Sequence, residues 1–246
     1  MELTNKNVFV TGSSRGIGLA IAHKFASLGA NVVLNGRGQL GQDLLDNFAG
    51  YGVKVLAISG DISSAQDAKR MVTEAIETLG RVDILVNNAG ITKDGTLKKM
   101  TVEQWQDVIN TNLNSVFNLS KAVLDDMVAA GHGRIINISS INGQKGQFGQ
   151  TNYSAAKAGM HGFTMALAQE VAKKGVTVNT ISPGYIATAM VMAVPEEIRN
   201  QIIAQIPVNR LGKPEEIGGL VTYLASDGAG FITGSNIAIN GGQHMK

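Results

Sequence analysis

Short runs of β-branched and aliphatic residues alternate with longer segments of helical period, and this alternation constrains the fold most. Residues 7–10, NVFV, are apolar at three of four positions, and residues 31–35, 54–59, 83–87, 134–139, 176–182 and 236–240 form similar runs. Between the first two runs, residues 16–28 carry apolar side chains at the i, i+3, i+4 spacing of an amphipathic helix. Apolar strands separated by helices indicate a parallel sheet covered by helices on both faces.

The expected helices span residues 16–28, 39–49, 64–79, 101–129, 152–173, 195–205 and 214–226. Composition does not shift along the 246 residues, and no low-complexity tract or fixed-period repeat interrupts them. We therefore expect a single α/β domain over residues 1–246, built as a doubly wound sheet. Ligands of such sheets bind beyond the carboxyl ends of the strands, where the strand order reverses.

Composition argues against several other classes of protein. The formal net charge is +2, with 21 basic and 19 acidic residues intermixed, so we expect no nucleic-acid partner. There is no cysteine, and His23, His132, His161 and His244 lack the spacing of metal ligands, so we interpret them as structural or surface residues and expect no metal. No apolar stretch approaches the ~18 residues of a membrane span, and the first residues do not resemble a signal peptide. We expect a cytoplasmic protein without a membrane partner.

The first motif, T-G-S-S-R-G-I-G at 11–18, joins the first expected strand to the first helix. Glycines allow a tight turn and close approach to a pyrophosphate, whose charge a helix N-terminus favours. This context indicates a dinucleotide site of the Rossmann type, although a glycine-rich turn without a ligand is the alternative. The expected contacts are Gly12, Ser14, Arg15, Gly16, Ile17 and Gly18.

The end of the second strand indicates which dinucleotide binds. NAD enzymes usually carry an acidic residue here for the ribose hydroxyls, whereas an arginine suits a 2′-phosphate. Residues 35–38 contain no acid, and Asn35 is followed closely by Arg37. We therefore expect NADP(H) as cofactor, with Arg37 as a solvated loop residue in the alternative reading.

Two further strand ends supply expected cofactor contacts. Asp61 and Ile62 follow the third strand, where the adenine would lie. Asn88, Ala89 and Gly90 follow the fourth strand, and their small size permits close backbone approach. We interpret the neighbouring Asn87 as structural, because buried asparagines often hold turns by side-chain to backbone bonds.

The candidate catalytic group is Tyr153-Ser154-Ala155-Ala156-Lys157. A spacing of four places Tyr153 and Lys157 on one helix face. A cation beside a tyrosine lowers its pKa from about 10 toward the range useful for proton transfer. Ser140, just past the fifth strand, is placed to donate a hydrogen bond to a carbonyl oxygen. A Tyr-x-x-x-Lys pair is weak by itself, but it becomes specific beside the nucleotide loop.

These motifs resemble those of the short-chain dehydrogenase/reductases. The resemblance rests on residues 11–18, N-N-A-G at 87–90, a serine thirteen residues before the tyrosine, Y-x-x-x-K and Pro183-Gly184, and it runs from Val8 to the end of the chain. It implies that Tyr153 protonates the carbonyl oxygen as hydride arrives, and that Lys157 holds the nicotinamide ribose and lowers the tyrosine pKa.

The same resemblance implies further roles. Ser140 would position the carbonyl, and Asn112 would hold a water that links Lys157 to solvent. The nicotinamide would be flanked by Pro183, Gly184, Ile186 and Thr188. A substrate lid is expected at about residues 184–205.

Residues 142–153, 161–172, 183–188 and 241–245 are similar to those of the NADPH-dependent acetoacetyl-CoA reductases, a group within that family. The resemblance implies reduction of a short 3-oxoacyl thioester to the (R)-3-hydroxyacyl thioester, in a homotetramer. Ala189 departs from the pattern, since an aspartate usually stands there in the lid. The loop at 146–150 should pass over the acyl end of the site, so we expect substrate contacts from Ser140, Gln147, Phe148, Gln150, Tyr153 and Tyr185.

Two alternatives remain open. The thioester carrier is acyl carrier protein rather than CoA in the similar 3-oxoacyl-(acyl-carrier-protein) reductases. A non-catalytic NADP-binding regulator is the more distant alternative, and the presence of both Tyr153 and Lys157 argues against it.

Overall fold

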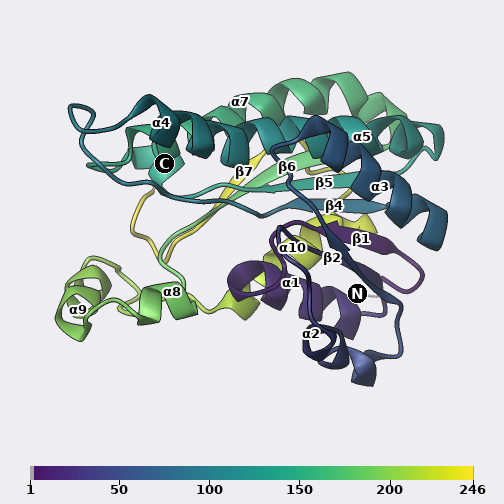
Figure 1. The fold of residues 1–246 in the computed structure, drawn as a ribbon, viewed down its shortest axis with the longest axis horizontal. Helices are drawn as coiled ribbons and strands as arrows, with labels where there is room; N and C mark the ends of the chain where they lie inside the picture. The colour runs from purple at the N-terminus through teal and green to yellow at the C-terminus, as the bar shows by residue number, and fades with distance from the viewer. Residues whose placement is uncertain (1–2, 246) are drawn as a thin grey trace.

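The computed structural model describes residues 3–245 and contains a seven-stranded, wholly parallel sheet (Figure 1). Every adjacent pair of strands is parallel, and the order across the sheet is β3-β2-β1-β4-β5-β6-β7. This confirms the expected α/β, doubly wound Rossmann-type fold. The strands are β1 (Asn7–Val10), β2 (Asn31–Gly36), β3 (Val55–Ser59), β4 (Ile84–Asn87), β5 (Gly133–Ile138), β6 (Val176–Pro183) and β7 (Asn236–Ile239).

The strand order reverses between β1 and β4, the neighbours at the centre of the sheet. Val10 of β1 lies opposite Leu34 of β2 on one side and Val86 of β4 on the other. The loops that follow these three strands therefore leave the same edge of the sheet side by side. A doubly wound sheet binds its ligand at this point.

Helices cover both faces of the sheet (Figure 1). On one face lie α1 (Gly16–Ser27), α2 (Gln42–Asp46) and α10 (Pro214–Ala225). On the other face lie α3 (Ala65–Leu79), α4 (Val102–Ile109), α5 (Ser115–Ala129) and α7 (Thr151–Val171). Within residues 3–245, no helix has both the length and the apolar character needed to cross a lipid bilayer.

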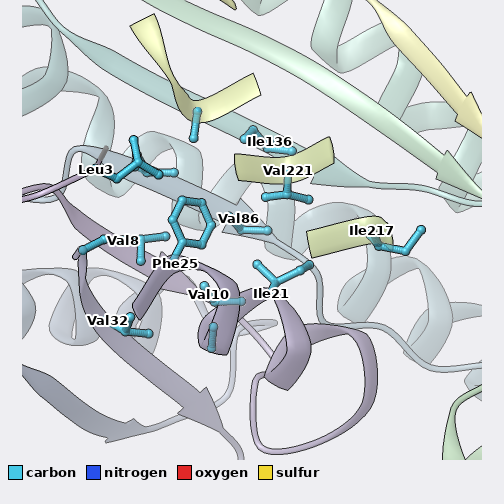
Figure 2. Close-up of a cluster of buried hydrophobic side chains, with 14 of the residues drawn as sticks. Leu3, Val8, Val10, Ile21, Phe25, Val32, Val86, Ile136, Ile217 and Val221 are labelled. Atoms are coloured by element: carbon cyan, nitrogen blue, oxygen red, sulfur yellow. The ribbon is translucent and has the colours of Figure 1, made fainter. Parts of the chain in front are cut away.

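The sheet separates two hydrophobic cores, because successive residues of a strand point to opposite faces. Val8 and Val10 of β1 pack with Ile21 and Phe25 of α1, and Figure 2 shows the Phe25 ring among these side chains. Phe9, between the two valines, packs instead with residues of α3, α5 and α7. The strands rich in apolar residues, which predicted burial on both faces, thus supply both cores.

Two of the expected helices differ in the structure. The prediction of one helix over 39–49 is wrong, because only α2 and a 3₁₀ turn at Ala49–Tyr51 form there. Gly38 and Gly41 precede α2, and glycine disfavours a helix interior by about 1 kcal/mol. The expected helix over 101–129 is divided into α4 and α5 by a π-helical segment at Asn110–Asn114.

Three short helices stand near the expected binding edge. The helix α6 (Asn142–Lys145) follows β5 in a segment for which the sequence predicted no element. The expected lid contains α8 (Ala189–Met192) and α9 (Glu196–Ala204), which extend away from the sheet at the lower left of Figure 1. That these two helices act as a lid stays a prediction.

Candidate active site

The loop between β1 and α1 requires glycine at three positions. Gly12 and Gly16 have φ angles of +62° and +59°, in the left-handed region that favours glycine. At Gly18, a Cβ atom would lie 2.3 Å from the carbonyl oxygen of Gly12, closer than real contacts allow. The glycine spacing of the motif is therefore explained by the geometry of this turn.

The N-terminus of α1 has the character of an anion site. The N-cap residue Arg15 makes no side-chain capping bond, and the first turn holds no acidic residue. Ser14 and Arg15 are exposed. The free N–H groups and the positive end of the helix dipole favour a phosphate group. The cradle and its donors fit the pyrophosphate of a dinucleotide, and the individual cofactor contacts of this loop stay predictions.

Asn35 at the end of β2 has an internal role. It is buried, its Oδ1 accepts from the Gly12 N–H at 3.4 Å, and its Nδ2 donates to the Ile58 carbonyl at 3.1 Å. These bonds hold the loop after β1 to the ends of β2 and β3. The Arg37 side chain, two residues on, is exposed. Asn35 therefore shapes the loop, whereas the exposed guanidinium of Arg37 is accessible to a ligand.

The loop after β3 presents an exposed Asp61 and a buried Ile62. The Asp61 carboxylate accepts from the N–H and hydroxyl of Ser63 at 2.9 and 2.7 Å, which fixes its direction. The backbone carbonyl of Ile62 accepts from Asn118 of α5 at 3.1 Å. Cofactor contacts from Asp61 and Ile62 stay predictions.

Asn88 and Ala89, after β4, are bonded directly to the end of β1. The Asn88 side chain donates to the carbonyls of Thr11 and Gly12 at 2.9 and 3.2 Å. The N–H of Ala89 donates to the Thr11 hydroxyl at 3.0 Å. Asn87 donates to the Asn137 side chain at 2.9 Å inside the sheet, which agrees with its structural interpretation.

Ser140, Tyr153 and Lys157 come together at the carboxyl end of β5. The Lys157 side chain is 3% exposed, and its Nζ lies 5.6 Å from the centroid of the Tyr153 ring. The same Nζ donates to the carbonyl of Ile138, the last residue of β5, at 2.7 Å. The Ser140 side chain is close enough to Tyr153 to lower its pKa by hydrogen bonding. The helix α7 thus carries both residues of the pair, and the segment that follows β5 carries the serine.

The pKa values differ from the expectation for this pair. Burial raises the pKa of Tyr153 above 10, and the negative charge of Asp94 adds to the increase, while the Ser140 hydrogen bond opposes it. Burial also lowers the pKa of Lys157 from 10.5 to about 7. Near neutral pH the lysine is thus only partly charged, and it does not lower the tyrosine pKa in the ligand-free protein. The tyrosine therefore keeps its proton.

Asn112 lies in the π-helical segment and is fully buried. Its Oδ1 accepts from the Ile91 N–H at 2.8 Å, and its Nδ2 donates to the Ile91 carbonyl at 2.9 Å. A Cβ atom on Gly90 would lie 3.2 Å from Asn112 Oδ1 and 3.5 Å from Lys157 Nζ. The three residues therefore meet at one place, and a water-holding role for Asn112 stays a prediction.

The loop at 146–150 is tied to Ser140 by hydrogen bonds. Gln150 accepts from the Asn142 side chain and donates to the Asp94 carboxylate, both at 2.9 Å. The N–H of Asn142 donates to Ser140 Oγ at 3.1 Å. Gln147 is exposed, and Phe148 is 87% exposed. The two residues are available to a substrate, while Gln150 already has protein partners.

The segment after β6 approaches the nucleotide loop. Pro183 is buried and its carbonyl accepts from the Ile141 N–H at 2.8 Å, next to Ser140. At Gly184 a Cβ atom would lie 2.8 Å from Asn240 Cα. A Cβ atom on Gly16 would lie 3.7 Å from Thr188 Cγ2. The expected nicotinamide side of the site therefore adjoins the expected phosphate side.

Tyr185 and Ile186 begin the expected lid. Tyr185 is half-buried and Ile186 is buried. Gly212 fixes both residues, since its N–H donates to the Tyr185 carbonyl at 2.9 Å and its carbonyl accepts from the Ala187 N–H at 2.8 Å. Contacts of Tyr185 with substrate and of Ile186 with nicotinamide stay predictions.

Sequence reasoning missed three polar residues at this edge: Asp94, Asn142 and His161. His161 lies one helical turn beyond Lys157, and its Nε2 is 2.9 Å from the Ser139 hydroxyl. Its spacing was visible, because Tyr153, Lys157 and His161 recur every four residues along α7. No comparable spacing marks Asp94 or Asn142, whose places depend on how the loops meet.

Comparison with known proteins agrees with this geometry. The family model described as Enoyl-(Acyl carrier protein) reductase matches residues 12–244. The acetoacetyl-CoA reductase of Allochromatium vinosum is 53% identical over 239 residues, which cover 96% of this chain and 97% of that protein. The acetoacetyl-CoA reductase of Cupriavidus necator is 50% identical over 99% of this chain and all of that protein.

A second kind of relative is almost as similar. The 3-oxoacyl-(acyl-carrier-protein) reductase of Pseudomonas aeruginosa is 46% identical over the full length of both chains. The family match covers the chain from the nucleotide loop through β7, and the relatives align over 96% or more of both chains. The chain belongs to the short-chain dehydrogenase/reductase family of oxidoreductases.

Proposed function

We propose that this enzyme uses NADPH to reduce a short 3-oxoacyl thioester, acetoacetyl-CoA, to the (R)-3-hydroxyacyl thioester. One observation carries the proposal: Tyr153 and Lys157 lie together on α7, with Lys157 Nζ 5.6 Å from the Tyr153 ring centroid, at the strand edge that also holds Ser140 and the nucleotide loop. The hydroxyls of Ser140 and Tyr153 can both donate hydrogen bonds to the oxygen of a carbonyl group that is being reduced by the cofactor. The two acetoacetyl-CoA reductases, at 53% and 50% identity, support the choice of substrate.

The proton in this reaction comes from Tyr153. Because burial raises the pKa of Tyr153, the phenol is protonated at neutral pH and is a donor rather than a base. The bound cofactor supplies the hydride to the carbonyl carbon. As negative charge develops on the carbonyl oxygen, the Ser140 hydroxyl stabilises it by a hydrogen bond and the Tyr153 hydroxyl transfers its proton to it. The alkoxide is far more basic than a phenolate, so a raised tyrosine pKa still permits the transfer.

Lys157 connects this acid to the cofactor. Its Nζ is held by the Ile138 carbonyl at 2.7 Å and lies 5.6 Å from the Tyr153 ring centroid. An ammonium with three donors can bond the nicotinamide ribose as well as the carbonyl. The Lys157 pKa of about 7 leaves the group close to its titration point at working pH. A proton lost by the tyrosine can then be replaced through this side chain.

The preference for NADPH over NADH follows from charge. Arg15 and Arg37 are both exposed beside the loop after β1, and residues 35–38 contain no carboxylate. A 2′-phosphate would gain charge-assisted hydrogen bonds from guanidinium groups, and nothing there would repel it. The free ribose hydroxyls of NADH would meet no acidic acceptor.

The CoA thioester is favoured over the carrier-protein thioester by the positions of three basic residues, because an acidic carrier protein would bind best to cations around the site. Arg134 is 5% exposed at the first half of β5 and pairs with Asp227. Lys173 and Lys174 are exposed but precede β6, at the opposite edge of the sheet from Tyr153. These three cations are therefore not placed to hold an acidic protein at the site.

We also propose a homotetramer. Phe117 of α5 and Phe231 after α10 are 56% and 104% exposed, and Leu97 and Val102 before and on α4 are 69% and 64% exposed. Large apolar side chains exposed to this extent favour subunit contacts. Light scattering coupled to gel filtration tests this, and a monomer at micromolar concentration contradicts it.

Steady-state kinetics with four substrate pairs tests the proposed function. Acetoacetyl-CoA and the acetoacetyl-carrier protein are each combined with NADPH and with NADH. We expect the highest kcat/KM for acetoacetyl-CoA with NADPH, and a steep decrease for acyl chains beyond about six carbons, because the bulky Phe148 and Tyr185 leave little room. A carrier-protein substrate that is reduced ten times more efficiently than the CoA ester would overturn the proposed carrier, and a preference for NADH would overturn the proposed cofactor.

A further inference from the structure

His161 lies between the ends of two strands that carry the active site. Its Nε2 atom is 2.9 Å from the hydroxyl of Ser139 and 3.4 Å from the hydroxyl of Ser182. Ser139 directly precedes Ser140, and Ser182 directly precedes Pro183. Both serines are buried, with exposed fractions of 4% and 0%. One ring nitrogen thus bridges the carboxyl ends of β5 and β6.

The hydrogen-bond partners of the serines determine which group donates. The Ser139 hydroxyl donates its single proton to the carbonyl of Lys157 at 2.9 Å, since a carbonyl can only accept. The Ser182 hydroxyl likewise donates to Asn236 Oδ1 at 2.7 Å. With both hydroxyl protons in these bonds, each serine oxygen accepts from His161, and this arrangement assigns the ring proton to Nε2.

We propose that His161 is a positioning residue of the reductase, whose Nε2–H holds the strand ends that carry Ser140 and Pro183 at a fixed separation. The inference rests on the proposed function, in which Ser140 meets the substrate carbonyl and Pro183 flanks the nicotinamide. Through Ser139, the same hydrogen bonds reach the backbone of Lys157. His161 thus adds a side-chain link between these strand ends and the catalytic helix, beside the backbone bonds from Ser139 to Ile181 and from Ile141 to Pro183.

Such a role affects the chemical step more than binding. Reacting atoms must approach to about 3–3.5 Å with aligned orbitals, and a misplacement of 1 Å can cost about 10²-fold in rate. The expected contacts with the cofactor phosphates lie on the loops after β1 and β2, which His161 does not contact through these bonds. Loss of its Nε2–H should therefore lower turnover while leaving the affinity for NADPH nearly unchanged.

The test compares His161→Leu with His161→Gln, because the glutamine amide can place an N–H near the Nε2 position and leucine cannot. Three quantities are measured: kcat for the 3-oxoacyl thioester that the wild type reduces best, the NADPH Kd by fluorescence, and the primary kinetic isotope effect with NADPH deuterated at the transferred position. For His161→Leu we expect a kcat decrease of about tenfold or more, a Kd within about twofold, and a larger isotope effect as hydride transfer becomes rate-limiting. His161→Gln should recover most of the turnover.

The matched control is His132→Leu. His132 precedes β5 at its other end and contacts Lys6 at 3.3 Å, so its loss removes a hydrogen-bonded histidine away from the site. It should lower the thermal midpoint without changing the isotope effect. Ser182→Ala removes one acceptor without changing the histidine, and it keeps the test decisive if His161→Leu does not fold. We expect it to lower kcat about threefold to tenfold.

Each outcome has a defined meaning. The proposal is overturned if folded His161→Leu, or Ser182→Ala in its place, has wild-type kcat and isotope effect, or if glutamine is as harmful as leucine. The control His132→Leu must have the same kcat as the wild type. If the wild type reduces no acetoacetyl-CoA but reduces another 3-oxoacyl thioester, the proposed substrate fails while the role of His161 is still tested on the better substrate.

Discussion

At the scale of single residues, Tyr153 is the acid of the proposed reaction. Tyr153→Phe removes the hydroxyl without removing volume, so the protein should fold and bind NADPH as before. Turnover of acetoacetyl-CoA should decrease by about 10²–10⁴-fold, the usual contribution of general acid catalysis. Single-turnover kinetics under saturating NADPH measure this directly. Tyr223→Phe is the control, because Tyr223 is a half-exposed tyrosine of α10 that lies outside the site.

Arg37 is the residue on which the cofactor preference rests. Arg37→Ala should raise the KM for NADPH about tenfold to a hundredfold, because a charge-assisted hydrogen bond contributes roughly 1.5–3 kcal/mol. The KM for NADH, which lacks the 2′-phosphate, should change by less than about twofold. An equal increase for both cofactors in the variant would show that Arg37 stabilises the loop rather than the phosphate.

The residues of the site differ in how well the sequence predicted their surroundings. The glycines at 12, 16 and 18 were predictable, because a tight turn with close backbone approach accepts no other residue. The environment of Lys157 was not predictable from the sequence. Its pKa is depressed because the side chain of this α7 residue is buried against the end of β5. The residue type shows which chemistry a side chain can perform, but the desolvation that shifts its pKa is set by the tertiary structure.

At the scale of elements, strands were predicted more accurately than helices. Runs rich in β-branched and aliphatic residues mark β1 to β7 closely, although β6 also buries the polar residues Asn179, Thr180 and Ser182. The π-helical segment at Asn110–Asn114 gave no local signal. In this wider turn, the Asn112 side chain forms hydrogen bonds with the N–H and the carbonyl of Ile91, which lies 21 residues away in the sequence. Long-range pairing of this kind leaves no periodicity in a sequence.

The loop between β1 and α1 is the element most sensitive to added volume. Gly18→Ala places a methyl group 2.3 Å from the Gly12 carbonyl oxygen and 2.5 Å from the Asn88 amide, so the loop must move. We expect a loss of about 1–3 kcal/mol in the free energy of unfolding and an NADPH Kd raised at least tenfold. Urea unfolding and fluorescence titration measure the two effects.

Gly162→Ala is the matched control for that substitution. Gly162 lies on α7, and a Cβ atom there would meet nothing within 4 Å. Alanine is favoured over glycine in a helix interior by about 1 kcal/mol, so this variant should be slightly more stable and bind NADPH normally. Destabilisation of both variants by the same amount would contradict the steric argument for Gly18.

At the scale of the whole molecule, the two edges of the sheet differ in chemistry. The carboxyl edge gathers Ser140, Tyr153 and Lys157 with the nucleotide loop. The opposite edge holds Arg134 and His132, and burial together with the positive charges of Arg134 and Lys6 lowers the pKa of His132. The parallel topology produces this separation, because every strand begins at one edge and ends at the other. Variants at the opposite edge are therefore natural controls for catalysis.

Global stability should depend on the buried Lys157. Its pKa is about 7 in the folded protein and 10.5 in the unfolded chain, because burial disfavours the charged form. Between these values the unfolded chain binds more protons than the folded protein, so the free energy of unfolding must rise with pH. From pH 7.5 to 9.5 we expect the ligand-free protein to gain on the order of 2 kcal/mol, since one pKa unit corresponds to about 1.36 kcal/mol. Urea unfolding across this range measures the gain.

Lys157→Met is the control, because it keeps an unbranched side chain without a titrating group, and its free energy of unfolding should show almost no such increase. A wild-type protein whose free energy of unfolding is constant from pH 7.5 to 9.5 would contradict the burial of a neutral lysine.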